Sequence, residues 1–79
     1  MQQKAKNLSD ALNQALDELE APENIRERSI ILSKMLPITK QQAWALLEGH
    51  TIPDDDILAL ISSELEIDVA ALGLGTIKK

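Results

Sequence analysis

Cysteine, tyrosine and phenylalanine are absent from this 79-residue sequence, and Trp44 is its single large aromatic residue. The absence of cysteine excludes disulfides, thiolate metal sites and a cysteine nucleophile, and it fits a reducing compartment. With one tryptophan and no other large ring, the core has to be built from Leu, Ile and Ala side chains. Hydrophobic residues make up 44% of the chain, which predicts a folded domain rather than disorder.

Long apolar runs are also lacking. No segment approaches the roughly 20 apolar residues that cross a bilayer, and the first four residues do not lead into the apolar stretch of a secretory signal. We therefore expect a cytoplasmic protein without membrane contact. The length suits one domain covering residues 1–79, with residues 1–6 and 74–79 as loose tails.

The charge is acidic and unevenly distributed. The formal net charge is −5, and the first and last thirds of the chain carry the excess of Asp and Glu. Residues 23–50 are the exception, because this segment contains four cationic and three acidic residues. The cationic residues are Arg26, Arg28, Lys34 and Lys40, and the acidic ones are Glu23, Glu27 and Glu48. An acidic chain is repelled by phosphate backbones, so nucleic-acid binding would depend on this middle third.

Apolar spacing and capping signals predict four or five helices and no strands. A stripe at i, i+3, i+4 and i+7 marks the first helix, with Asn7 as its N-cap. The stripe consists of Leu8, Ala11, Leu12, Ala15, Leu16 and Leu19. Pro22 limits this helix, and Asn24 caps a second one that stops before Pro37.

Similar signals for the starts and ends of helices occur in the second half of the chain. Thr39 is the expected N-cap of a third helix over residues 40–48, and Gly49 ends it in a left-handed conformation. Pro53-Asp54 opens a fourth helix, and Asp68 caps a short last turn that Gly73 closes. The fold class is therefore a compact all-α domain.

Catalytic and metal-binding patterns are missing from the sequence. His50 stands alone, without a second ligand at metal spacing, and the acidic run Asp54-Asp55-Asp56 is explained by its place at a helix N-terminus. There is no glycine-rich phosphate loop and no nucleophile paired with a base. We therefore expect a non-enzymatic protein without metal, cofactor or small-molecule substrate.

From Leu32 to Leu72 the residues follow one longer pattern without a gap. Leu32-Ser33 gives a large and then a small residue, residues 36–39 form a turn, and Gly49 is followed by Pro53-Asp54. The apolar positions of the pattern are Ile38, Ala43, Leu46, Leu58, Ile61, Leu65, Ile67, Val69 and Leu72. This segment resembles the lambda-repressor and Cro (XRE-type) family of helix-turn-helix domains. The sequence departs from that family in carrying Pro37 in the turn and no permanent cation in the 49–53 loop.

The resemblance implies a transcriptional regulator that lays its third helix in the major groove of duplex DNA and acts as a homodimer. Lys40, Gln41 and Gln42 would meet bases in the first turn, with Trp44 and Ala45 further along. Arg26 could add electrostatic attraction. The implied DNA-binding residues are Ser29, Arg28, Lys34, Thr39, Lys40, Gln41, Gln42 and Ala45. The alternative is that these residues form only a solvated polar surface.

A second hypothesis concerns apolar residues where the family usually has polar ones. Trp44 and Leu47 are three residues apart on the third helix, and Ile30 and Ile31 lie on the second. Exposed apolar clusters tend to bind other proteins. The chain would then be an antiactivator or antirepressor that covers a transcription factor. Alternatively, Trp44 folds back over the first helix and completes the core.

Overall fold

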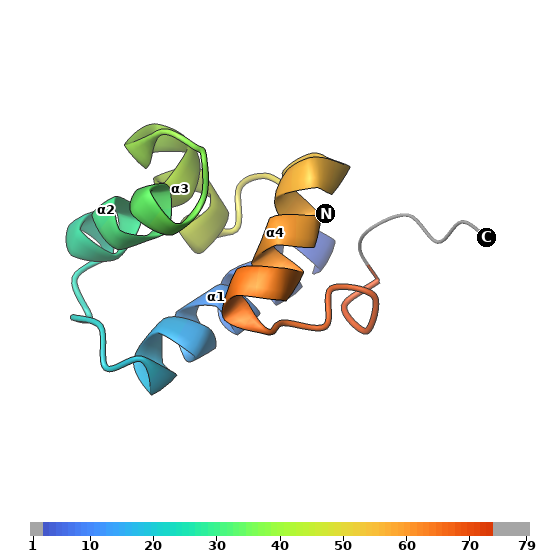
Figure 1. The fold of residues 1–79 in the computed structure, drawn as a ribbon, viewed down its shortest axis with the longest axis horizontal. Coiled ribbons are helices and arrows are strands. Elements are labelled where there is room, and N and C mark those ends of the chain that lie inside the picture. Colours follow the sequence, from blue (N-terminus) through green and yellow to red (C-terminus); the bar gives the residue numbers. More distant parts are fainter. Residues whose placement is uncertain (1–2, 74–79) are drawn as a thin grey trace.

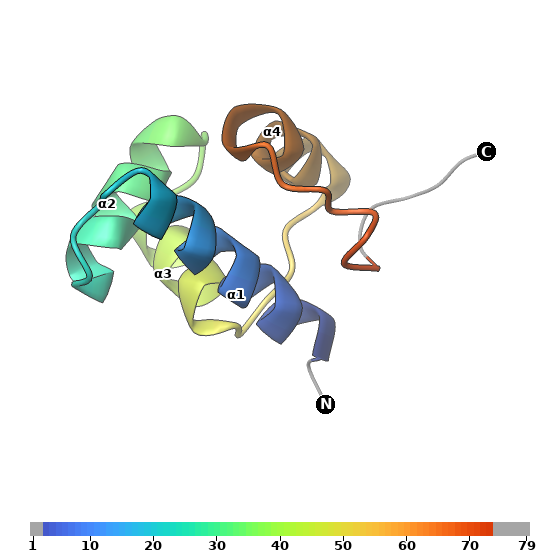
Figure 2. The same ribbon diagram turned by 90° about the horizontal axis from the view of Figure 1, so that it is seen from below.

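The computed structural model describes residues 3–73 and is built from four helices, without a strand in that range. They are α1 (Gln3–Glu18), α2 (Ile25–Met35), α3 (Lys40–Glu48) and α4 (Asp55–Leu65) (Figure 1). This confirms the all-α class. In the second view, α1 lies across the molecule between the α2–α3 pair and α4 (Figure 2).

The helix boundaries follow the local capping chemistry of the sequence. Asn24, Thr39 and Asp54 are the N-caps of α2, α3 and α4, and each accepts hydrogen bonds from amides of the first turn. Thr39 and Gln42 complete a capping box. Gly49 ends α3 at φ 78° in the left-handed region, which costs glycine little. These predicted boundaries are confirmed.

The start of α1 differs from the prediction. The helix begins at Gln3 and not after Asn7, so residues 3–6 belong to it and the expectation of a loose segment there is wrong. Packing explains the difference, because Ala5 is fully buried and the backbone of Lys6 runs close to Gly49. Residues 1–2 and 74–79 lie outside the described part of the chain.

The end of α1 also differs. Leu19 was expected to continue the buried stripe, but its side chain is 59% exposed. The helix ends at Glu18, and Glu20 then adopts a left-handed φ of 62°, which turns the chain toward α2. The apolar periodicity of the sequence therefore extends one residue beyond the end of α1.

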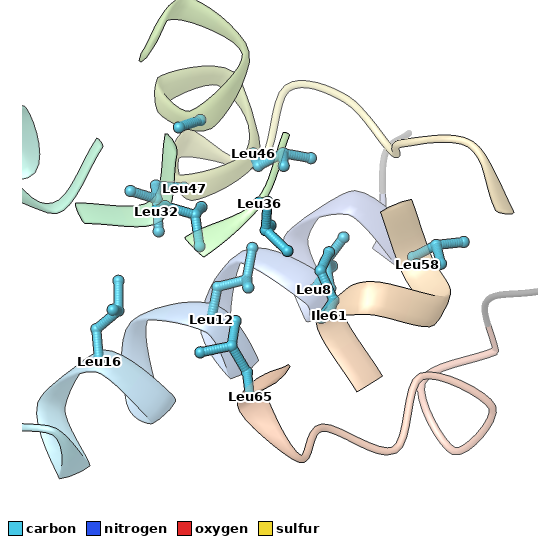
Figure 3. Packing of buried hydrophobic residues seen from close by; sticks show 11 residues of the cluster. Leu8, Leu12, Leu16, Leu32, Leu36, Leu46, Leu47, Leu58, Ile61 and Leu65 are labelled. Carbon is cyan, nitrogen blue, oxygen red and sulfur yellow. The ribbon is translucent and has the colours of Figure 1, made fainter. Parts of the chain in front are cut away.

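The core is aliphatic, as the composition requires, and all four helices contribute to it (Figure 3). Fully burying one such side chain contributes about 1.5–3 kcal/mol, so α1 with its three buried leucines is a main source of stability. The cluster comprises Leu8, Leu12, Leu16, Leu32, Leu36, Ala43, Leu46, Leu47, Leu58, Ile61 and Leu65. Within residues 3–73, no helix has the length and apolar character that crossing a membrane requires.

The final turn of the described chain lies beyond α4. The side chain of Asp68 accepts a hydrogen bond from the amide of Ala71, and Gly73 follows with φ 79°. Leu72 in this turn packs against the core. The expected capped turn is therefore present, as a turn and not as a fifth helix.

Candidate nucleic-acid interface

The candidate site is built on the pairing of α2 with α3. The two helices pack against each other and are joined by residues 36–39, in which Leu36 is buried and Pro37 is exposed. One face of α3 points into the core through Ala43, Leu46 and Leu47. The opposite side, here called the outer face of α3, consists of Lys40, Gln41, Trp44, Ala45 and Glu48; Ala45 is half-buried and the others are exposed.

A groove lies on each side of this outer face. The α2–α3 groove is lined by Ile25, Arg26, Ser29, Ile30, Lys40 and Trp44. The α3–α4 groove runs past Gln41 and Ala45 to the Asp54 cap of α4. The outer face of α3 is therefore a ridge with cations on its α2 side and a carboxylate on its α4 side.

The first turn of α3 divides into free and engaged side chains. Lys40 and Gln41 are exposed on the ridge. The carboxamide oxygen of Gln42 accepts from the amide of Thr39 at 2.9 Å, and the Thr39 hydroxyl accepts from the amide of Gln42 at 3.0 Å. These two side chains hold the helix end in place. Of the three expected base-reading residues, Lys40 and Gln41 are the better placed to reach a ligand.

Arg28 does not lie where a phosphate contact needs it. Its side chain is buried and ion-paired with Asp17, and it donates to the carbonyl of Pro22. One guanidinium nitrogen also donates to the carbonyl and side-chain oxygens of Asn13, at 3.2 and 3.0 Å. The guanidinium therefore fastens α2 to α1. The expectation that Arg28 grips DNA is wrong, because its position on α2 faces α1.

Ser29 is also engaged inside the protein. Its hydroxyl donates to the carbonyl of Ile25 at 2.8 Å, and the residue is buried. Ser29 is the fifth residue of α2, which begins at Ile25 as its Asn24 cap predicts. The hydroxyl is therefore satisfied within its own helix and is not free to donate to a phosphate, which corrects the expectation that Ser29 binds DNA.

Two other cations of α2 remain exposed. Arg26 lies in the first turn and Lys34 in the last, and Ile30 stands midway between them. Residues four apart share one side of a helix, so the three form a stripe along α2. Because Arg26 and Ile30 line the α2–α3 groove, this stripe borders the ridge. Arg26 and Lys40 thus line the same groove, whereas Arg28 does not.

The apolar surface around Trp44 is smaller than the sequence suggested. Trp44 is 43% exposed, so it does not fold back into the core. Its ring lies 5.2 Å from the ring of His50, with the two planes tilted by 43°. Ile30 joins it in the groove, whereas Ile31 packs against the core.

Leu47 was expected to extend that surface, but it is only 3% exposed. It stands four residues after Ala43 and therefore shares the inward side of α3. Its carbonyl accepts from the hydroxyl of Ser9 at 2.7 Å and from the side chain of Asn13 at 3.2 Å. Leu47 is a core residue that ties α3 to α1, and its assignment to an exposed protein-binding surface is wrong.

Sequence reasoning missed the carboxylates beside the ridge. Glu48 lies on the outer face of α3, and Asp54 lines the neighbouring groove. Asp54 was interpreted only as a cap, and nothing in the sequence places it next to Gln41. Within residues 3–73 no group of three or more His, Cys, Asp or Glu side chains is arranged to hold a metal ion. Comparison with protein-family models, curated proteins and solved structures finds no match to this chain.

Proposed function

We propose that this chain is a small transcriptional regulator that binds duplex DNA through α3. The observation that carries the proposal is the outer face of α3, where Lys40 and Gln41 are both exposed in the first turn and Arg26 lines the same groove as Lys40. The resemblance to helix-turn-helix domains adds an analogy, since most members of that fold bind DNA.

The dimensions of α3 suit the major groove. An α-helix with its side chains is about 10–12 Å across, and a major groove about 12 Å wide admits it. Lys40 would donate to guanine acceptors, and Gln41 would pair with adenine. Arg26 and Lys34 would contact phosphates on the side of α2.

The charge of the site makes this binding weak and sensitive to salt. Three exposed cations flank the ridge, and counterion release would then give a slope of about −2.7 in a plot of log affinity against log salt. Glu48 and Asp54 oppose the same phosphates. A homodimer presenting two such ridges would double the contacts, so we expect useful affinity from two copies on one site.

The experiment is a titration of fluorescently labelled duplex DNA followed by anisotropy at 20–200 mM salt. Lys40→Ala with Gln41→Ala should weaken binding about tenfold and make the salt slope shallower by about 0.9, because two contacts and one charge are lost. Lys6→Ala is the matched control. It also removes one cation, but Lys6 lies near Gly49, at the other end of α3, and is paired with Asp10. Equal losses in both variants, or no binding at 20 mM salt, would contradict the proposal.

A second function is favoured by one observation, the exposure of Trp44 beside Ile30 in the α2–α3 groove. Tryptophan is enriched at the centres of protein interfaces. On this hypothesis the chain is an antiactivator or antirepressor that covers a transcription factor. Trp44→Ala would then abolish capture of that factor, and the Lys40 and Gln41 substitutions would leave it largely unchanged.

A further inference from the structure

We propose that Trp44 determines sequence specificity by contacting the methyl group of a thymine in the major groove. This inference rests on the proposed DNA binding and goes beyond it, because it names the base and the chemical group that Trp44 recognises. The alternative occupant of the same surface, another protein, becomes an outcome of the test.

The first argument is the position of Trp44 on the ridge. It follows Lys40 by four residues and Gln41 by three, so the three side chains lie on one side of α3. All three are exposed. A helix that brings Lys40 to base edges therefore brings the indole into the same DNA groove, on the α2 side of the ridge.

The second argument is the charge around the indole. The α2–α3 groove has an apolar lining from Ile25, Ile30 and Trp44, and its two cations are Arg26 and Lys40. An apolar surface bordered by cations complements a ligand that carries apolar groups between anionic ones. The major groove of DNA is such a ligand, because phosphates border it on both sides.

The third argument is the placement of the indole relative to solvent. The centroid of the Trp44 ring lies 5.2 Å from that of the His50 ring, and Trp44 stays 43% exposed. Burying this apolar surface against polar, hydrated base edges would contribute little binding free energy. The apolar group that the major groove offers is the C5-methyl of thymine, and it is the group that the indole can desolvate favourably.

The helix geometry also fixes the spacing of the bases. Three residues of α3 correspond to a rise of about 4.5 Å, whereas successive base pairs are about 3.4 Å apart. If Gln41 pairs with an adenine, Trp44 reaches a thymine within two base pairs of it. The site should therefore contain an adenine and a thymine at this separation.

The test begins with selection of binding duplexes from a random library by the full chain. At the enriched thymine, deoxyuridine is then substituted, which removes the methyl group and leaves the hydrogen-bonding edge unchanged. Losing one buried methyl should weaken binding by the wild-type chain about fourfold. Trp44→Ala should bind the thymine and deoxyuridine duplexes equally, and Trp44→Phe should keep part of the preference.

Leu19→Ala is the matched control, since it removes an exposed apolar side chain at the far end of α1. It should keep the fourfold preference for thymine. Circular dichroism melts establish that each variant is folded. Selected sites without a thymine, or equal binding of both duplexes by the wild-type chain, would overturn the inference and leave DNA binding intact. Failure to bind any duplex would overturn both and direct attention to a protein that covers Trp44.

Discussion

At the scale of single residues, Arg28 shows how the same side chain can suggest opposite roles. In the sequence it is one of four cations in the least acidic third of the chain, which favoured a phosphate contact. In the fold its guanidinium is surrounded by oxygens of α1 and of the α1–α2 connection. A buried arginine is stable only when its donors are satisfied, and these contacts satisfy them. Its role is to hold two helices together.

We therefore expect Arg28→Met to lower the free energy of unfolding by about 2–4 kcal/mol in urea denaturation, because several charge-assisted hydrogen bonds are lost. Asp17→Asn is the comparison, because the side chain of Asp17, the acidic partner in the ion pair, is 63% exposed. It should cost about 1 kcal/mol or less. If both substitutions cost the same, the ion pair alone and not the set of backbone contacts would be what Arg28 contributes.

At the scale of helices, the parts set by local chemistry could be predicted from the sequence. The caps Asn24, Thr39 and Asp54 and the left-handed Gly49 act on the first or last turn of their own helix, so their residue types suffice. The start of α1 could not be predicted in this way. It depends on burial of Ala5 and on the approach of α1 to Gly49, which lie far apart in the sequence.

The candidate site likewise has some features that the sequence predicts and others that depend on tertiary packing. The exposure of Lys40 and Gln41 follows from the 3.6-residue period of α3, and the sequence predicted it. The burial of Arg28 and Leu47 depends on how α2 and α3 pack against α1, and Ser29 is buried where α2 lies beside α3; the sequence placed all three on the surface. Whether a polar side chain is free or engaged is a tertiary property, and periodicity does not report it.

The groove between the ridge and α4 leads to a prediction at the same scale. Asp54 caps α4 and lines the groove beside Gln41, where its charge opposes phosphate. Asn caps helices about as well as Asp, so Asp54→Asn should keep the melting temperature nearly unchanged. Removing a like charge roughly 10 Å from a phosphate should raise DNA affinity about twofold at low salt.

Asp68→Asn is the matched control for that substitution, because Asp68 caps the last turn in the same manner and does not line either groove beside α3. Anisotropy titrations of both variants at 20 mM salt measure the difference. A gain of equal size in the two variants would mean that only the net charge matters, and it would remove Asp54 from the interface.

At the scale of the whole molecule, the charge is separated between two regions. The chain carries a net charge of −5, yet Arg26, Lys34 and Lys40 gather along α2 and the start of α3. An acidic protein whose exposed cations gather in this way within residues 3–73 is expected to approach DNA with this edge first. The same separation predicts that binding fades quickly as salt rises.

The measurement that tests this account most directly is a titration of the isotopically labelled chain with random-sequence duplex DNA at 20 mM salt, followed through its backbone amide shifts. We expect shifts in residues 25–30 of α2 and 40–45 of α3, reversed by 200 mM salt, with α1 and α4 unaffected beyond the Asp54 cap. A flat titration, or shifts centred on the first turns of α1, would contradict binding through α3, because non-specific binding is strongest at low salt.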